Sequence, residues 1–215
     1  LDMYTGKNIS PGFFSWAIPT GDTTRVGTWT KAELMNGISS EQYLDKLLQD
    51  HKINSRFRLC SEVARFCGPV PSGIVRKPLI ERVALFGDSA GVCKPTTGGG
   101  IGPGFKQVDL LVPRLSKCME NNELSRGTMN SISALLKEMA RNQRKKRALR
   151  DAFLTEMSDV ELEKIFDVWV RPEVTDLINE FGDIENPIPL GIKMLREVPE
   201  FRRLAGRAAK AVLWG

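Results

Sequence analysis

The sequence predicts an α+β fold in which strands dominate the first part of the chain and helices the last. Large and small side chains alternate around residue 16, which is the two-residue period of a strand. A short apolar run at 83–86 ends in Gly-Asp and is followed by a glycine-rich loop. After residue 104, apolar side chains recur at helical spacing. We therefore expect a sheet-rich region, a strand–loop–helix connection and a helical region, in that order.

The first eighty residues are expected to hold most of the strands. Phe14, Trp16 and Ile18 alternate with small residues, so their side chains should share one face of a strand. A turn at 19–22 leads into a second strand at 24–29, which completes a hairpin with an aromatic face. Such a face is either ordinary core packing or the wall of an apolar channel.

A helix and a further strand should follow the hairpin. Either serine at 39–40 can cap a helix that runs to about His51. Its expected buried stripe consists of Tyr43, Leu44, Leu47 and Leu48. Residues 56–66 alternate loosely and predict another strand, and prolines between 69 and 78 then break the pattern. We place a domain boundary there, so that the sheet region covers 1–80.

The run at 83–86 has the composition of a strand that is buried on both faces. Asp88 would then emerge just past its carboxyl end, where ligands bind in open α/β sheets. A carboxylate can accept hydrogen bonds from sugar hydroxyls, and glycines lack the Cβ that would keep a ligand from the backbone. The helix expected from Ile101 would add free amides that favour negative charge. The alternative is a glycine-rich surface turn that binds nothing.

The remainder of the chain reads as helices. After residue 104, apolar side chains fit one face of a helix, and these are Val108, Leu111, Val112 and Leu115. Pro113 should either kink this helix or mark its start. Further helices are expected over 130–153, from Ser158, over 172–181 and from Pro199.

The composition is that of a folded chain of one or two domains, with 41% hydrophobic and 27% charged residues. No apolar run approaches the roughly 18 residues that span a bilayer. The net charge of +5 favours anionic surfaces as neighbours. Two stretches concentrate this charge, one at 141–150 and one at 193–210 beside an apolar stripe that ends in Trp214. They are interpreted as solvated helix faces or as a membrane-surface contact, and no motif of a nucleic-acid reader accompanies them.

The cysteines and the histidine indicate no metal site. Cys60, Cys67, Cys93 and Cys118 are too far apart for Cys-x-x-Cys chemistry, and we expect reduced, buried thiols. Cys93 lies inside the glycine-rich loop, where a redox or a packing role is open. The single histidine, His51, cannot by itself form a catalytic triad or a zinc site.

Two segments of the sequence resemble a known family. Residues 87–91, with Pro95 and 98–101, resemble the GD-x-A-G…P…G-x-G-I signature of flavoproteins with the p-hydroxybenzoate hydroxylase fold. Residues 11–19 are similar to the P-G-x-Y-x-W-x-F-P segment of the geranylgeranyl reductases, which include archaeal enzymes that saturate the isoprenoid chains of membrane lipids. Phe14 stands where Tyr is usual and Ile18 where Phe is usual, and residues 27–29 replace a G-x-G.

The resemblance implies an FAD site and an isoprenoid site. The implied cofactor-binding residues are Gly87, Asp88, Gly91, Pro95, Gly98, Gly99, Gly100 and Ile101. The implied substrate wall consists of Phe14, Trp16, Ile18 and Trp29. Residues 81–122 would be the C-terminal segment of a Rossmann-like FAD-binding domain, 1–80 a partial substrate-binding sheet domain and 123–215 a C-terminal helical region. No side chain stands out as the proton donor, so the catalytic residues stay unassigned.

From this resemblance we expect an FAD-dependent reductase of geranylgeranyl chains, cytoplasmic and peripheral on the membrane surface, served by an unidentified electron donor. No G-x-G-x-x-G follows a strand, so we expect the C-terminal part of a longer flavoprotein, which alone binds FAD weakly or not at all and is incomplete for activity. Two alternatives stay open. One is a flavin-dependent aromatic monooxygenase on the same scaffold, and the other is a non-catalytic lipid- or membrane-associated module.

Overall fold

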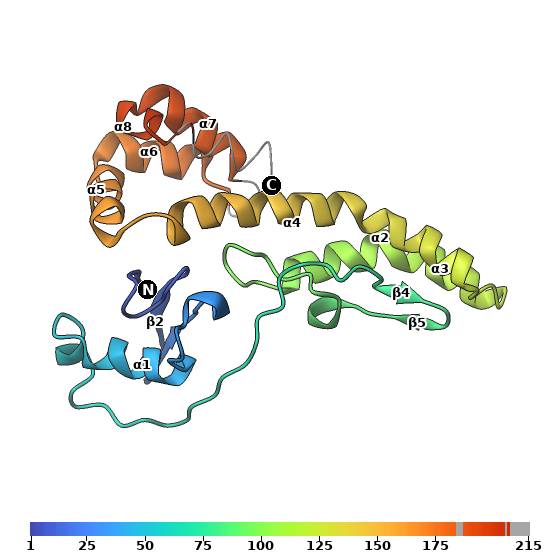
Figure 1. The fold of residues 1–215 in the computed structure, drawn as a ribbon, viewed down its shortest axis with the longest axis horizontal. Helices are drawn as coiled ribbons and strands as arrows, with labels where there is room; N and C mark the ends of the chain where they lie inside the picture. The colour runs from blue at the N-terminus through green and yellow to red at the C-terminus, as the bar shows by residue number, and fades with distance from the viewer. Residues whose placement is uncertain (184–186, 205, 207–215) are drawn as a thin grey trace. The chain divides into compact units, whose positions relative to one another are not determined.

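The computed structural model of the protein describes residues 1–183, 187–204 and 206 (Figure 1). It divides into two compact units. Of the described residues, the first contains 1–67 and those from 151 to 206, and the second contains 68–150. Both hold strands and helices, which confirms a mixed α+β fold. The unit boundaries differ from the sequence-based regions at 80 and 122, because the helices after residue 125 pack against the segment that contains the glycine-rich loop.

The first unit begins with a three-stranded antiparallel sheet of order β1-β2-β3. Its strands are β1 (Asp2–Tyr4), β2 (Ser15–Thr20) and β3 (Thr23–Thr28). The predicted hairpin is confirmed, and its register pairs Trp16 with Gly27. Gly21 in the turn has a φ of +72°, a conformation that glycine adopts without strain.

The sheet buries the face opposite to the aromatic one. Ser15 and Ala17 are buried, whereas Trp16 is half-buried and Ile18 is 38% exposed. Small side chains let neighbouring segments approach closely here, and the Ser15 hydroxyl donates to Thr28 Oγ1 at 3.0 Å. The aromatic face of β2 is therefore only partly covered within the residues that the structure describes.

The capped helix after the sheet is confirmed. A short 3₁₀ turn (Ala32–Leu34) precedes α1 (Ser40–Gln49), and Ser39 caps α1 in a reciprocal capping box with Gln42. Of its predicted stripe, Tyr43 and Leu47 are buried, while Leu44 and Leu48 are half-buried.

The strand predicted at 56–66 is wrong. A 3₁₀ turn (Asn54–Arg56) is followed by a stretch without regular structure. Its apolar side chains Leu59, Val63 and Phe66 are exposed, and no described segment pairs with this backbone. Loose alternation alone does not make a strand, because a strand is stable only when another strand accepts its hydrogen bonds.

Among the described residues, four helices of the first unit follow a π-helical turn (Asp151–Thr155). These are α5 (Asp159–Trp169), α6 (Pro172–Phe181), α7 (Ile188–Glu197) and α8 (Pro199–Arg202). A capping box on Ser158 starts α5 as predicted, and α7 was not predicted. The helices share a core made of Val168, Val174, Met194, Val198 and Phe201. The Lys31–Asp151 ion pair of 3.1 Å and hydrogen bonds from the Lys7 amide to the Asp159 carboxylate connect this part of the unit to its N-terminal part.

The second unit opens with a two-stranded antiparallel hairpin, β4 (Leu79–Ile80) and β5 (Val83–Ala84). The prediction of a four-residue strand buried on both faces is wrong for the described chain. Val83 is 46% exposed, and a tight turn in which Arg82 has a φ of +59° joins β5 to its one described neighbour, β4. Two-residue strands bury only the side chains that reach a helix, as Leu79 does.

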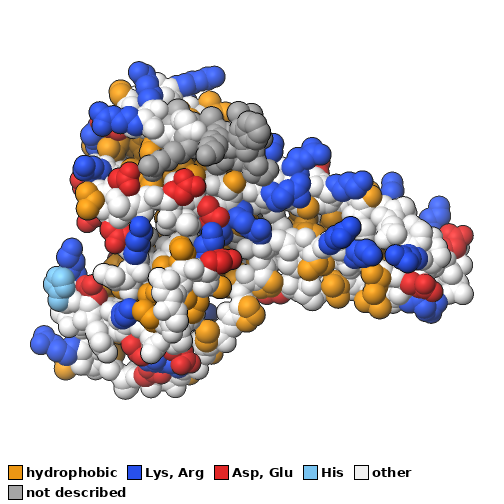
Figure 2. All heavy atoms as spheres, viewed as in Figure 1, with side chains coloured by type: hydrophobic (Ala, Val, Ile, Leu, Met, Phe, Trp, Pro, Cys, Tyr) orange, Lys and Arg blue, Asp and Glu red, His pale blue; other side chains and the backbone are white. Residues whose placement is uncertain are grey.

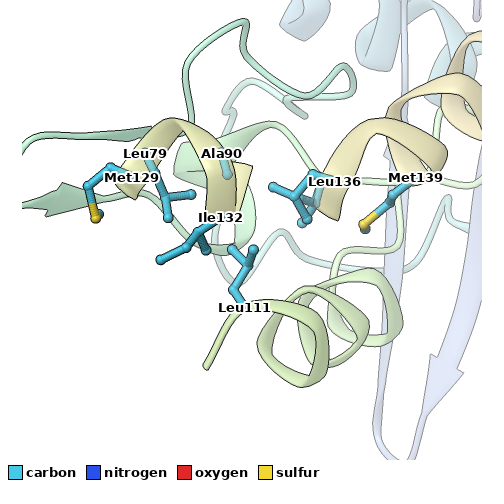
Figure 3. Packing of buried hydrophobic residues seen from close by; sticks show 8 residues of the cluster. Leu79, Ala90, Leu111, Met129, Ile132, Leu136 and Met139 are labelled. Atoms are coloured by element: carbon cyan, nitrogen blue, oxygen red, sulfur yellow. The ribbon is translucent and has the colours of Figure 1, made fainter. Parts of the chain in front are cut away.

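Three helices share a core with this hairpin. They are α2 (Ile101–Glu120), α3 (Arg126–Ser133) and α4 (Lys137–Arg150), with a 3₁₀ turn (Ala134–Leu136) between the last two. The single helix predicted at 130–153 is thus replaced by several segments, and α2 runs through Pro113 instead of beginning there. The core contains Leu79, Ala90, Val92, Leu111, Met129, Ile132, Leu136 and Met139 (Figure 3).

We predict that Leu111→Ala lowers the free energy of unfolding by about 2–5 kcal/mol, because the fully buried side chain leaves a cavity. The neighbouring Val112→Ala is the control, since Val112 is substantially exposed and should cost less than about 1 kcal/mol. Urea unfolding followed by circular dichroism measures both. Equal losses for the two variants would contradict the packing described here.

Candidate cofactor site

The turn after β5 is built from glycines in left-handed conformations. The backbone is extended at Phe86, turns at Gly87 with a φ of +60°, and forms a 3₁₀ turn (Gly87–Ala90) that ends at Gly91 with a φ of +74°. A Cβ on Gly91 would lie 2.2 Å from the Gly73 carbonyl oxygen. Only glycine fits there, because both the conformation and the close approach exclude a side chain.

A buried glutamine of α2 holds the start of this turn. The Gln107 side chain is 0% exposed, its Oε1 accepts from the Gly87 amide at 2.9 Å, and its Nε2 donates to the Leu85 carbonyl at 3.0 Å. Sequence reasoning missed this residue. The sequence could have indicated it, because Gln107 lies four residues before Leu111 and so on the same buried face of the helix. A polar side chain on a buried face needs hydrogen-bond partners.

Asp88 emerges from the turn with its side chain exposed. Its Oδ1 accepts from Cys93 Sγ at 3.1 Å. A Cβ on Gly100, the residue before α2, would lie 2.9 Å from the same oxygen. The structure therefore brings Asp88 beside the start of α2, where the partial positive charge of a helix N-terminus stabilises a carboxylate.

The loop that leads into α2 folds back on itself. The Lys94 amide donates to the Gly99 carbonyl and the Gly98 amide donates to the Lys94 carbonyl, both at 3.0 Å. Gly98 has a φ of +74°. The first amides of α2, at Ile101 and Gly102, have no carbonyl one turn earlier within the helix and can donate to a ligand.

Cys93 is buried and its thiol is protonated. Burial, together with the hydrogen bond and charge of Asp88, raises the pKa of Cys93 to about 11. The thiol is therefore a donor to the carboxylate and a poor nucleophile at neutral pH. All four cysteines are free, as predicted, but Cys60 and Cys67 are exposed and Cys118 is only half-buried, so the expectation of buried thiols holds for Cys93 alone.

Helix α4 supplies a second set of contacts to the loop. Gln143 is buried, and its Nε2 donates to the carbonyls of Gly91 and Cys93 at 3.0 Å each. The buried Arg150 donates to the carbonyl of Pro95 at 2.7 Å, and Arg147 donates to the carbonyl of Ser72. The interpretation of 141–150 as a purely solvated basic face is therefore wrong for Arg147 and Arg150. Figure 2 shows the other Lys and Arg side chains gathered along α4.

The aromatic residues of the first unit form a cluster. Phe13 and Trp29 stack with ring centroids 3.6 Å apart, and Phe14 meets both Trp16 and Trp29 edge-on at 6.1 Å. The indole of Trp16 lies across Gly27, where a Cβ would be only 2.3 Å from the ring. Phe14, Trp16 and Trp29 are thus brought together as predicted. Phe13, which the sequence reading missed, joins them, whereas Ile18 pairs with Arg25 farther along the hairpin.

The described apolar side chains of the C-terminal basic stretch pack in a core, whereas Arg196, Arg202 and Arg203 are exposed. Val198 is buried in the core of α5–α8, with Leu195 and Leu204 packed against it. Lys193 pairs with Glu197 at 2.7 Å and lies over the ring of Phe181. The remaining residues of this stretch, Arg207, Ala208, Lys210, Val212 and Trp214, lie outside the described residues.

The described part of the chain holds no group of His, Cys, Asp and Glu side chains that could bind a metal ion. His51 is exposed. None of the described helices has both the length and the apolar character needed to cross a membrane.

Two known proteins with similar sequences are named as a digeranylgeranylglycerophospholipid reductase and a geranylgeranyl diphosphate reductase. No family model matches the chain. A digeranylgeranylglycerophospholipid reductase of Methanocaldococcus jannaschii is 25% identical over 166 residues, which cover 77% of this chain and 42% of the relative. The chloroplastic geranylgeranyl diphosphate reductase of Nicotiana tabacum is 34% identical over 100 residues, which cover 46% of this chain and 20% of the relative.

A solved structure has a similar fold. It is a geranylgeranyl bacteriochlorophyll reductase-like protein from Thermoplasma acidophilum, which matches with a TM-score of 0.73 and 22% identity. The match covers 96% of this chain and 50% of that one. The chain thus spans less than half the length of the two reductases above and half of the solved chain. Over that stretch, the comparisons confirm the resemblance of this protein to the geranylgeranyl reductases, which the motifs at 11–19 and 87–101 indicated.

Proposed function

We propose that the protein is part of an FAD-dependent reductase that saturates isolated double bonds in geranylgeranyl chains, with membrane lipids as substrates. One observation carries the proposal. The exposed carboxylate of Asp88 lies beside the glycine loop and the first turn of α2, in a chain whose relatives are named as geranylgeranyl reductases. The names of those relatives support the substrate class, and the geometry of the loop supports the cofactor.

The residues of the second unit fit a flavin nucleotide. Nothing lies within 4 Å of where a Cβ on Gly87 would be, so a ligand can approach the backbone there. The Asp88 carboxylate can accept hydrogen bonds from the hydroxyls of a ribityl chain. The amides at the start of α2 would face a group that gains negative charge, as the N1/C2 edge of a flavin does on reduction.

When bound, a reduced flavin supplies hydride to one carbon of the alkene, while a proton is added to the other. An isolated alkene is a poor hydride acceptor, so catalysis depends on alignment and on exclusion of water. The loop between Asp88 and Ile101 is held by hydrogen bonds within itself and would fix the position of the cofactor for this purpose.

The aromatic cluster of the first unit supports an apolar substrate. The cluster offers aromatic ring faces from Phe13, Phe14, Trp16 and Trp29. The nearby hydroxyls are already bonded, because Ser15 donates to Thr28 and Thr28 donates to the Ile9 carbonyl. A fully buried isoprene unit contributes about 2–3 kcal/mol at about 25 cal/mol per Å². An aromatic monooxygenase would instead need polar groups that bind a phenol. Phe14 stands where Tyr is usual, so this position lacks a hydroxyl that could bind one.

Contact with a lipid surface is part of the proposal, because the substrate chain belongs to a membrane lipid. The exposed side chains of Arg141 and Arg144 lie on α4 and can meet anionic headgroups. Arg147 and Arg150 differ from them, because these two side chains donate to the backbone carbonyls of Ser72 and Pro95.

We predict that Asp88→Asn raises the Kd for FAD about 10- to 100-fold in the full-length protein, because hydrogen bonds to a charged acceptor contribute about 1.5–3 kcal/mol. Quenching of flavin fluorescence measures the Kd. Asp109→Asn is the matched control, since it removes an exposed carboxylate from α2 and should leave the Kd unchanged. Equal Kd values for wild type and Asp88→Asn would remove Asp88 from the site.

We predict that the full-length protein, supplied with chemically reduced FAD and a geranylgeranyl lipid, adds about 2 Da per double bond, because a hydride and a proton are added to each. Mass spectrometry of the lipid measures the gain. Incorporation of oxygen from air would favour the monooxygenase instead. Protein that binds the lipid but never a flavin would favour a non-catalytic lipid-binding module.

A further inference from the structure

We propose that Gln143 is a positioning residue for the flavin loop, and that α4 is thereby part of the cofactor site. The inference rests on the proposed flavin site and goes beyond it. It adds a residue that lies about fifty positions after the loop, on a helix that carries neither sequence motif.

Every hydrogen-bonding group of the Gln143 amide is used to hold backbone. Its Oε1 accepts from the Ile74 amide at 2.9 Å, and its Nε2 donates to the carbonyls of Gly91 and Cys93. The side chain is 6% exposed, so these bonds form away from water. One side chain therefore joins the segment before β4 to two positions in the loop after β5.

The two carbonyls belong to the residues that hold Asp88. The Gly91 amide donates to the backbone carbonyl of Asp88 at 2.9 Å, and Cys93 Sγ donates to its carboxylate at 3.1 Å. Gln143 thus fixes the peptide units that set where the Asp88 carboxylate lies. It does not itself touch Asp88, so its effect on a ligand must pass through Gly91 and Cys93.

Two further side chains on the same face of α4 also donate to backbone carbonyls outside the helix. Residues 143, 147 and 150 have the i, i+4, i+7 spacing of one helical face. Arg147 donates to the carbonyl of Ser72, and Arg150 donates to the carbonyl of Pro95. The side chains at 143, 147 and 150 therefore donate to backbone carbonyls between residues 72 and 95, in and next to the proposed flavin loop. A face that served packing alone would be apolar.

Two replacements of Gln143 separate its role as acceptor for the Ile74 amide from its role as donor to the loop carbonyls. Gln143→Met keeps the length of the side chain and removes all three hydrogen bonds. Gln143→Glu keeps an acceptor for the Ile74 amide and removes both donors to the loop. Met139→Ala is the control for stability, because Met139 lies one turn earlier on α4, in the apolar core, and makes a cavity when truncated.

The experiment measures three quantities in the full-length protein. Flavin fluorescence measures the Kd for FAD, urea unfolding measures stability, and amide hydrogen exchange without flavin measures the opening of residues 91–99. We expect both Gln143 variants to raise the Kd about tenfold or more and to speed exchange at 91–99, because buried carbonyls lose their donors. Gln143→Glu should leave the Ile74 amide protected, and Met139→Ala should lower stability without raising the Kd more than about twofold.

The outcomes distinguish this role from the proposed function. Wild-type protein that binds no FAD overturns the proposed function, and the positioning role falls with it. Wild type that binds FAD, with a Gln143→Met variant that binds it equally well, overturns the positioning role alone. A rise in Kd that is the same for Gln143→Met and Met139→Ala at equal loss of stability would also overturn it, because the effect would then be one of folding.

Discussion

The candidate site depends on buried amide side chains that satisfy the backbone of a loop with little regular structure. Between β5 and α2 the chain makes one 3₁₀ turn, so few of its carbonyls and amides have partners in a helix or a sheet. A buried backbone group without a partner costs free energy comparable to a lost hydrogen bond. Gln107 and Gln143 supply the missing donors and acceptors from two different helices.

This arrangement leaves the Asp88 carboxylate available. The backbone of the turn is held from behind by α2 and α4, so the carboxylate does not itself maintain the fold. Its one described donor is the thiol of Cys93, a weak donor whose pKa is raised by burial. A strongly bonded carboxylate would have little capacity left for a ligand. The weak bond instead orients Asp88 and leaves lone pairs for hydroxyl donors.

The sequence predicted local features well and tertiary ones less well. The hairpin around Gly21 and the starts of α1 and α5 follow from neighbouring residues alone. The predictions of a strand at 56–66 and of burial on both faces at 83–86 were wrong, because both features depend on partners that are distant in the sequence. Gln107 and Gln143 were missed for the same reason, since their partners lie 20 to 69 residues away.

Helix α4 shows why a basic stretch cannot be assigned from its charge alone. Apart from Met139, which lies in the apolar core, α4 buries mainly polar side chains, and such a helix needs other contacts to be stable. In α4 these come from the row at 143, 147 and 150, whose donors reach carbonyls outside the helix. The exposed charges, such as Arg141 and Arg144, lie off this row. The helix therefore combines two roles on two faces. One face fixes the loop through backbone carbonyls, and the other keeps its charge for water or for an anionic surface.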